Sequence, residues 1–228
     1  MPAAELGELS AILSPAERAR AARFHAAAHA SRFTVAHARL RQILAALLGF
    51  APADIEFSAG DHGKPALAGK AARTGLEFNL SHSGELGLVG WAWHRAIGVD
   101  IEVWRPMSDE GAVVRRFFSP AEIAAYEALQ PALRTRGFFQ CWTRKEAYVK
   151  AVGRGLGLPL HSFDVSLQDS AAKMLLRASA VQDDGRSWSM AAPALREGRS
   201  AAVVLEGAPF LLRPLPRNEE NVMQKLWA

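Results

Sequence analysis

Two acidic residues in the stretch AIGVDIE, residues 96–102, have the chemistry and the spacing of a cation site. Asp100 and Glu102 are two positions apart, and alternate residues of a β-strand point to the same face. Apolar residues alternate with them, so a strand here would have one apolar face and one acidic face. Hard divalent cations such as Mg²⁺ prefer carboxylate oxygens. The alternative is a solvated strand face, or neutralisation of the acids by Arg95 or Arg105.

A predicted helix supplies a second group of charged residues, in FFQCWTRKEAYVKAVGRGLGLP, residues 138–159. At about 100° per residue, its apolar side chains share one face. Glu146 and Lys150 stand together at the edge of that face, with a spacing that also suits a simple i,i+4 ion pair. Lys145 falls within the apolar face. Either its stem carries the ammonium out to solvent or the ammonium meets an anion.

Two polar turns could bind phosphate. His82 lies between two serines in FNLSHS, residues 78–83, where a strand enters a turn. Its imidazole, the hydroxyls and nearby backbone N–H groups could hold a phosphate oxygen, or could form hydrogen bonds within the turn. The stretch DHGKP, residues 61–65, is a glycine turn that presents Lys64, either to a ligand or to solvent at the surface.

Helices and strands alternate in blocks. Ser14-Pro15-Ala16-Glu17 is a capping box that opens a helix predicted over residues 14–48, ending at Gly49. Short strands at 76–82, 86–93 and 96–102 follow, and their spacing predicts an antiparallel meander. Ser119-Pro120-Ala121-Glu122 is a second capping box that opens a helix over SPAEIAAYEAL, residues 119–129. A longer helix is predicted over about 134–152, ending at Gly153, and strands are predicted at 162–167, 173–179, 187–192 and 200–206. The repeated SPAE hints at duplication. We expect an α+β fold in two similar halves, residues 1–104 and 105–228.

The composition excludes several classes of protein. The chain has 228 residues, half of them hydrophobic, and no run approaching the ~20 apolar residues that span a bilayer. Its start lacks the features of a signal peptide, so a cytoplasmic location is expected. The single cysteine, Cys141, excludes an intramolecular disulfide and a multi-cysteine metal site. A net charge of +4 predicts no nucleic-acid partner, and fits a phosphorylated ligand, an acidic protein or a solvated surface.

The order of these motifs resembles one family. From about residue 14 to residue 160 the chain reads G-K-P, F-N-x-S-H-S, G-V-D-I-E and W-x-x-K-E-A-x-x-K, with FFSPAE before the last. This order resembles the 4′-phosphopantetheinyl transferase superfamily, and within it the type that acts on carrier proteins of secondary-metabolite and siderophore synthesis. The resemblance implies a monomer with two similar α/β halves in a pseudo-twofold arrangement, and an active site in the cleft between them.

The resemblance also implies a reaction and its residues. The phosphopantetheine arm of coenzyme A would pass to a serine of an apo acyl or peptidyl carrier protein of fatty acid, polyketide or nonribosomal peptide biosynthesis, with release of adenosine 3′,5′-bisphosphate. The cofactor would be Mg²⁺, with Mn²⁺ as the alternative. Carried over by motif, the metal ligands are Asp100, Glu102 and Glu146, the catalytic residues are Glu146, Lys150 and His82, and the residues that bind coenzyme A are Arg20, Lys64, Ser81, His82, Lys145 and Lys150. Arg32 is a second candidate for the nucleotide end, in the stretch FHAAAHASRF, which lacks the acidic pair and the threonine of the family pattern.

Two other functions remain compatible with these residues. One is a non-catalytic module that binds coenzyme A or a nucleotide, although such a module has no need of three metal-ligating acids. The other is a Mg²⁺-dependent phosphohydrolase, which would use the same acids with water in place of a serine.

Overall fold

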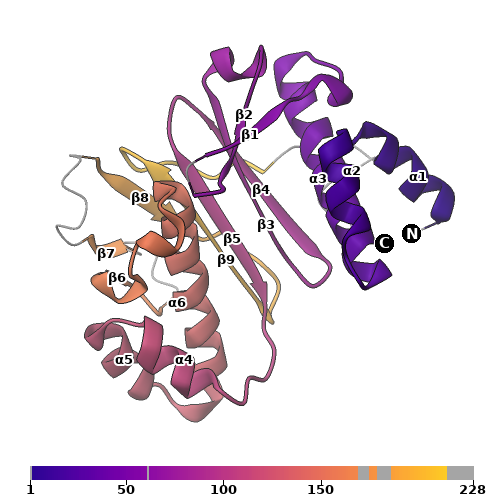
Figure 1. Cartoon of the computed structure of the whole chain (residues 1–228). Helices are drawn as coiled ribbons and strands as arrows, with labels where there is room; N and C mark the ends of the chain where they lie inside the picture. The colour runs from indigo at the N-terminus through magenta and orange to yellow at the C-terminus, as the bar shows by residue number, and fades with distance from the viewer. Residues whose placement is uncertain (1, 61, 169–174, 179–185, 215–228) are drawn as a thin grey trace.

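The computed structural model describes residues 2–60, 62–168, 175–178 and 186–214. Figure 1 shows the strands between two groups of helices, which confirms a mixed α+β architecture. The first group contains α1 (Ala3–Ile12), α2 (Pro15–Ala22) and α3 (Ala27–Leu48), and the second contains α4 (Glu110–Phe117), α5 (Pro120–Glu127) and α6 (Pro131–Val152). Within the described ranges, no helix has the length and the apolar character to cross a membrane.

The strands form small antiparallel sheets. The pairs are β1 (Phe57–Ala59) with β2 (Pro65–Leu67), β3 (Leu76–Ser83) with β4 (Leu86–Trp93), and β6 (Phe163–Val165) with β7 (Leu175–Ala178), while β9 (Arg199–Glu206) lies between β5 (Ile97–Val103) and β8 (Trp188–Ala191). Every predicted strand is confirmed, although positions 173, 174 and 179 of the predicted strand 173–179 lie outside the described residues. Helices α1 and α4 and the β1–β2 hairpin were not predicted. Short 3₁₀ turns occupy Pro52–Asp54, Ala71–Thr74, Gly155–Gly157 and Leu160–Ser162.

The predicted antiparallel meander is wrong at its third strand. Strand β5 takes its backbone partners from β9, about a hundred residues later in the chain, and not from β4. Pairing at that sequence distance leaves no mark in local turn chemistry. Strand β5 lies inside the predicted first half and β9 inside the second, while the division at residue 104 itself stays a prediction.

Side chains of β3 join β3 to β5. Each of three β5 amides, at every second position, donates to a polar side chain at every second position of β3. The bonds are Val99 N–H to Asn79 Oδ1 (2.8 Å), Ile101 N–H to Ser81 Oγ (3.4 Å) and Val103 N–H to Ser83 Oγ (3.2 Å). The residue numbers rise together, so the two strands run in the same direction. We call this row of side-chain bonds, from residues 79, 81 and 83 to β5, the polar seam.

The helix predicted over residues 14–48 is two helices. It breaks between Arg23 and Ala26, where the N-cap of α3 is extended, and no glycine or proline marks the break. The break lets α2 fold back beside α3, with the Phe24 ring 5.6 Å from the Phe33 ring. Tertiary packing therefore overrides the continuous helical propensity of this alanine-rich segment.

Folding back brings the first capping box against a buried arginine. Glu17 closes the box with Ser14 and also lies 2.7 Å from Arg41 Nη2 and 2.9 Å from His37 Nδ1. Arg41 donates further to the backbone carbonyls of Pro52 and Ile55. Burial alone would raise the pKa of Glu17, but hydrogen bonds from His37, Ser14 and Arg41 outweigh it and lower the pKa to about 2.

The second capping box meets a buried lysine in a similar way. Glu122 closes the box with Ser119 and lies 2.7 Å from Lys145 Nζ, and these two side chains are 2% and 0% exposed. Lys145 also donates to the carbonyls of Leu160 (2.7 Å) and Phe163 (2.8 Å). The ion pair fixes α5 against α6, and the bonds to the carbonyls fix the segment that leads into β6.

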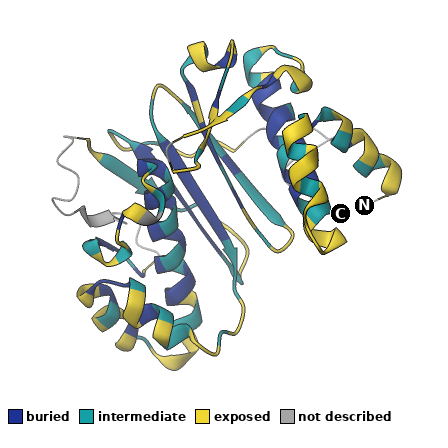
Figure 2. Cartoon of the chain, viewed as in Figure 1, coloured by how far each residue is buried: buried dark blue, intermediate teal, exposed yellow. Residues whose placement is uncertain are grey.

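Helix α6 packs directly on β5. Buried residues line both elements, as they do α3 and β9 (Figure 2). A Cβ atom on Gly98 would lie 2.1 Å from Ala147 O and 2.2 Å from Ala151 N of α6, so only glycine permits this approach. The core on the helix side includes Phe138, Phe139, Tyr148, Phe163 and Val204.

We predict that the Glu17 network makes stability depend on pH. Ionised Glu17 stabilises the folded state above its unfolded pKa of 4.5, and this stabilisation is lost as the pH falls toward the folded value of about 2. The difference in unfolding free energy between wild type and Glu17→Gln should therefore shrink by about 2 kcal/mol from pH 5 to pH 3. Urea unfolding at both values measures it. Glu8→Gln, at an exposed helical position, is the control and should show no such change.

We also predict that Gly98→Ala separates α6 from β5. The added methyl group meets helix backbone, which cannot rotate away, so the variant should lose about 1–3 kcal/mol of unfolding free energy. Gly7→Ala, on α1 with open space around it, should be neutral or slightly stabilising. A wild-type urea midpoint for Gly98→Ala would contradict the close approach of helix and strand.

Candidate active site

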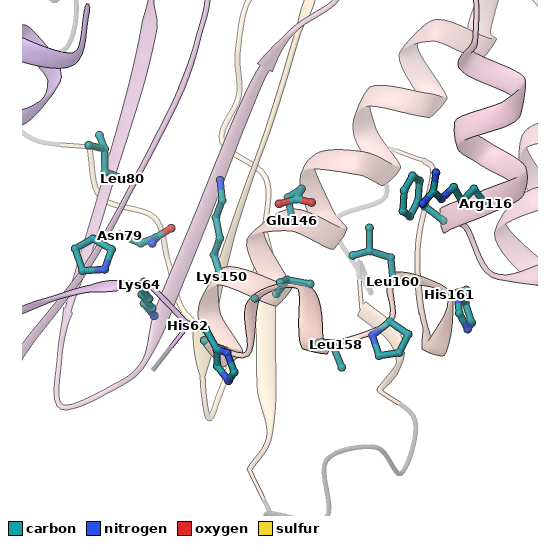
Figure 3. Close-up of a pocket in the computed structure, with 17 residues that line it drawn as sticks. His62, Lys64, Asn79, Leu80, Arg116, Glu146, Lys150, Leu158, Leu160 and His161 are labelled. Atoms are coloured by element: carbon teal, nitrogen blue, oxygen red, sulfur yellow. The ribbon is translucent and has the colours of Figure 1, made fainter. Parts of the chain in front are cut away.

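A pocket of about 520 Å³ opens between the β1–β2 hairpin, β3 and α6. One part of its lining is polar and includes Lys64, Asn79, Glu146 and Lys150. Another part is apolar and includes Phe117, Leu158 and Leu160. Glu146 and Lys150 project from α6, while Lys64 and Arg116 lie at opposite sides of the view (Figure 3). The pocket thus combines a charged region with an apolar one.

Asp100 is a buried carboxylate with one oxygen bonded and one without a partner. Its Oδ1 accepts from Ser81 Oγ at 2.7 Å and from Lys150 Nζ at 2.6 Å. Its Oδ2 is buried and has no hydrogen-bond partner among the described residues. Burial raises the pKa of Asp100, although Lys150 and Ser81 act in the opposite direction. Buried polar atoms are rarely left unpaired, so a free oxygen here marks a place for a ligand.

Glu102 repeats the arrangement. Its Oε2 accepts from Ser83 Oγ at 2.5 Å and from Arg105 at 3.2 Å, so both bonds fall on the same oxygen. This observation supports the predicted alternative that Arg105 neutralises one of the acids. Arg95, the other cation considered, donates instead to the backbone carbonyls of Glu206 and Ala208.

Glu146 completes a group of three acids. Burial raises its pKa first, and the negative charges of Asp100 and Glu102 raise it further, while Lys150 lowers it. The three carboxylates therefore lie within electrostatic range of one another. In the ranges that the structure describes, however, no three His, Cys, Asp or Glu side chains are close enough to hold a metal ion as they stand.

Lys150 is the cation at the centre of this group. It bonds Asp100 Oδ1 at 2.6 Å and Ser81 Oγ at 3.1 Å, whereas Glu146 is its neighbour one turn away on α6. Two cationic side chains thus neutralise the acidic face of β5. Lys150 serves Asp100, and Arg105 serves Glu102.

His82 lies on β3, near the side chains of Lys150, His37 and Arg32. Partial burial lowers its pKa, and the nearby positive charges of Lys150, His37 and Arg32 lower it further. Arg32 itself pairs with Glu85 at 2.5 Å. Cations that repel one another favour an anionic ligand between them, so this side of β3 suits a phosphate group.

Of the other residues predicted to bind coenzyme A, Lys64 lines the pocket and Arg20 does not. Lys64 lines the pocket, and its ammonium donates to the carbonyls of Ile97 (2.8 Å) and Ala151 (3.4 Å). Burial lowers the pKa of Lys64. Arg20 is exposed on α2, with its guanidinium over the Phe33 ring at 5.2 Å, and it does not line the pocket.

Lys145 requires a correction. The anion that its place on an apolar face demands is Glu122, and the lysine side chain has no exposed surface. Contact with coenzyme A, as predicted, does not fit this placement, because three bonds inside the core already hold the ammonium.

Two residues of the polar seam escaped the sequence analysis. Asn79 and Ser83 bond the amides of β5, and Ser83 also bonds a predicted metal ligand. The alternation N-x-S-x-S in FNLSHS was the available signal. Polar residues at every second position of a buried strand need hydrogen-bond partners on a neighbouring element.

Known proteins of one family are similar to this chain along most of its length. A model of the 4′-phosphopantetheinyl transferase superfamily matches residues 96–203, and one of the 4′-phosphopantetheinyl transferase N-terminal region matches residues 2–91. The chain is 37% identical to 4′-phosphopantetheinyl transferase HetI of Nostoc sp. over 90% of this chain and 84% of that protein. It is 33% identical to 4′-phosphopantetheinyl transferase Sfp of Bacillus subtilis over 68% of this chain and 67% of that protein. These matches show that the chain belongs to the 4′-phosphopantetheinyl transferase superfamily.

Proposed function

We propose that this protein transfers the 4′-phosphopantetheine arm of coenzyme A to a serine of an apo acyl or peptidyl carrier protein, in a Mg²⁺-dependent reaction. The observation that carries the proposal is the free Oδ2 of buried Asp100, which lies in a group of three acids with Lys150 beside it. Family membership supplies the reaction class, and the proposal extends it to a monomeric enzyme of the cytoplasm.

A divalent cation fits these residues. Asp100 has one oxygen that is held and one without a partner among the described residues, and the bonds to Glu102 fall on one of its two oxygens. Burial and then its acidic neighbours raise the pKa of Glu146. A cation relieves that repulsion. Mg²⁺ or Mn²⁺ would be held by Asp100, Glu102 and Glu146, and when bound it would neutralise oxygens of the diphosphate of coenzyme A.

The chain's own residues then divide the work. Glu146, with its raised pKa, takes the proton from the serine hydroxyl of the carrier protein. The serine oxygen bonds to the β-phosphorus, and the bond from that phosphorus to the bridging oxygen breaks, which releases adenosine 3′,5′-bisphosphate. Lys150, half-buried in the pocket, stabilises the charge that develops on the leaving phosphate. His82 and Ser81 lie on β3 beside Lys150 and bind the diphosphate.

The lining of the pocket suits the diphosphate and the pantetheine arm of the donor substrate. Its charged region at Lys64 and Lys150 suits the diphosphate, and its apolar region at Phe117 and Leu160 suits the uncharged pantetheine arm. Arg20 and Arg32, on the first group of helices, are proposed for the 3′-phosphate end.

The two capping boxes support two similar halves. In each half, the box glutamate pairs with a buried cation, Arg41 or Lys145, on the following helix of 22 residues. Each cation also donates to two backbone carbonyls beyond that helix. We propose that α3 and α6 are equivalent elements of a pseudo-twofold fold, with the active site between residues 1–104 and 105–228.

We predict that Lys150 and Asp100 are energetically coupled in metal-free protein. Lys150→Met leaves a buried carboxylate without its cation, so the free energy of unfolding should fall by about 1–3 kcal/mol. A cycle with Asp100→Asn and the double variant, measured by urea unfolding in chelator, should give a coupling of about 0.5–3 kcal/mol. The same cycle on the more exposed pair Glu5–Arg39, 3.5 Å apart, should give less than about 1 kcal/mol. Additive effects at Lys150 and Asp100 would contradict the pairing.

We predict that an apo carrier protein gains the mass of one phosphopantetheine arm when incubated with this protein, coenzyme A and Mg²⁺. Intact mass spectrometry measures the gain, which a chelator should abolish. Glu146→Gln should slow transfer about 100-fold or more, because the general base is lost. Glu8→Gln, an exposed glutamate on α1, should act as wild type does.

Each alternative function has its own outcome in that experiment. Binding of coenzyme A without transfer to several unrelated carrier proteins would indicate the binding module. Consumption of coenzyme A in the absence of any carrier would indicate the phosphohydrolase.

A further inference from the structure

The two hydrogen-bond partners of Ser83 determine which of them receives the proton of its hydroxyl. A serine hydroxyl has one proton to donate and two lone pairs to accept with. Ser83 Oγ accepts from Val103 N–H at 3.2 Å, and Glu102 Oε2 lies 2.5 Å from it. The amide takes one lone pair of Ser83 Oγ, and the single proton of Ser83 is donated to Glu102 Oε2. The hydroxyl thereby bridges the side chain of Glu102 to the amide of the next residue on β5.

Ser81 forms the same bridge two positions earlier. Its Oγ accepts from Ile101 N–H at 3.4 Å and from Lys150 Nζ at 3.1 Å, and it donates to Asp100 Oδ1 at 2.7 Å. In both cases a β3 serine and a cation hold the same carboxylate oxygen. The second oxygen of Asp100 has no partner among the described residues, and both bonds to Glu102 fall on Oε2.

Glu102 depends on its serine more than Asp100 does. The side chain of Glu102 is 20% exposed, compared with 6% for Asp100, and glutamate has one more rotatable bond. Its other partner, Arg105, is 58% exposed, and an ion pair with so exposed a side chain holds a geometry weakly. The hydroxyl of Ser83, tied to the backbone of β5, is therefore the firm contact that determines where the other oxygen of Glu102 points.

We propose that Ser83 is a positioning residue for the cation site: its hydroxyl fixes Glu102 by one oxygen and leaves the other oriented toward the metal. The inference rests on the proposed function, since it presumes that Glu102 is a ligand. Ser83 touches neither the substrate nor the metal in this role, and acts through the carboxylate it holds. Hydrogen-bond partners of ligands affect metal affinity because they pre-organise the ligand.

The test measures metal binding directly. Isothermal titration of Mn²⁺ into the full-length protein with coenzyme A present gives the Kd for wild type, Ser83→Ala and Ser83→Thr. We expect Ser83→Ala to bind Mn²⁺ about 10–100-fold more weakly. Ser83→Thr keeps a hydroxyl on a residue that favours strands, and should stay within about threefold of wild type. Raising the Mg²⁺ concentration should restore the transfer rate of Ser83→Ala, because the defect lies in occupancy.

A matched serine separates positioning from structure. Ser189 lies on β8 and donates its hydroxyl to the carbonyl of Gly207, so Ser189→Ala also removes a strand serine with one hydrogen bond. It should leave the Kd for Mn²⁺ unchanged. Hydrogen exchange of the Val103 amide in chelator gives a metal-free readout, and this amide should exchange faster in Ser83→Ala than in wild type.

The outcomes distinguish the two proposals. If wild type binds Mn²⁺ and Ser83→Ala binds it equally well, the positioning role is overturned, even where the variant is less stable or its Val103 amide exchanges faster. If wild type with coenzyme A binds no Mn²⁺, the proposed metal dependence itself is overturned, and the role of Ser83 falls with it. Weaker binding in Ser83→Ala, rescued in Ser83→Thr, supports both.

Discussion

The β3-facing edge of β5 is completed by side chains, and the rest of the site depends on this constraint. Buried backbone groups must be bonded, yet the groups on this edge meet residues of the polar seam and Lys64 instead of a strand backbone. Polar side chains are therefore required along a buried strand. Once present, the two serines have protons to donate, and the acids of β5 lie within their reach. The position of the site at the junction of two sheets follows from the bonding needs of one strand edge.

A rigid framework on both sides keeps the seam in register. Glu17 with Arg41, and Glu122 with Lys145, bind their helices to the segments that follow them, through buried ion pairs that also satisfy backbone carbonyls. Removing either partner of such a pair would leave a buried charge, so these helix positions are specified strongly. Because α6 is held in this way and contacts β5 at Gly98, Lys150 reaches Asp100 from a fixed direction.

Local sequence patterns predicted most helices and strands, while strand pairing and buried ion pairs depend on residues far apart in the chain. Capping boxes, alternation and glycine stops located α5, α6 and every strand, and motif order led to the family. Local signals cannot report that β5 pairs with a strand about a hundred residues away, or that α2 folds back without a helix breaker. Lys145 shows the limit clearly: its place on an apolar face correctly required an anion, but Glu122, on another helix, became the partner only through the fold.

An unpaired oxygen on a buried carboxylate is costly, and its persistence here needs a physical reason. Among the described residues, Ser81 and Lys150 donate to Asp100, and both bond Oδ1, so Oδ2 has no partner there. Since Ser81 also accepts from the amide of Ile101, it cannot turn to Oδ2 without breaking the seam. Lys150 lies on α6, whose backbone at Ala147 and Ala151 packs against Gly98 of β5. The same bonds that join the two sheets thus hold one oxygen of Asp100 and leave the other without a partner among the described residues.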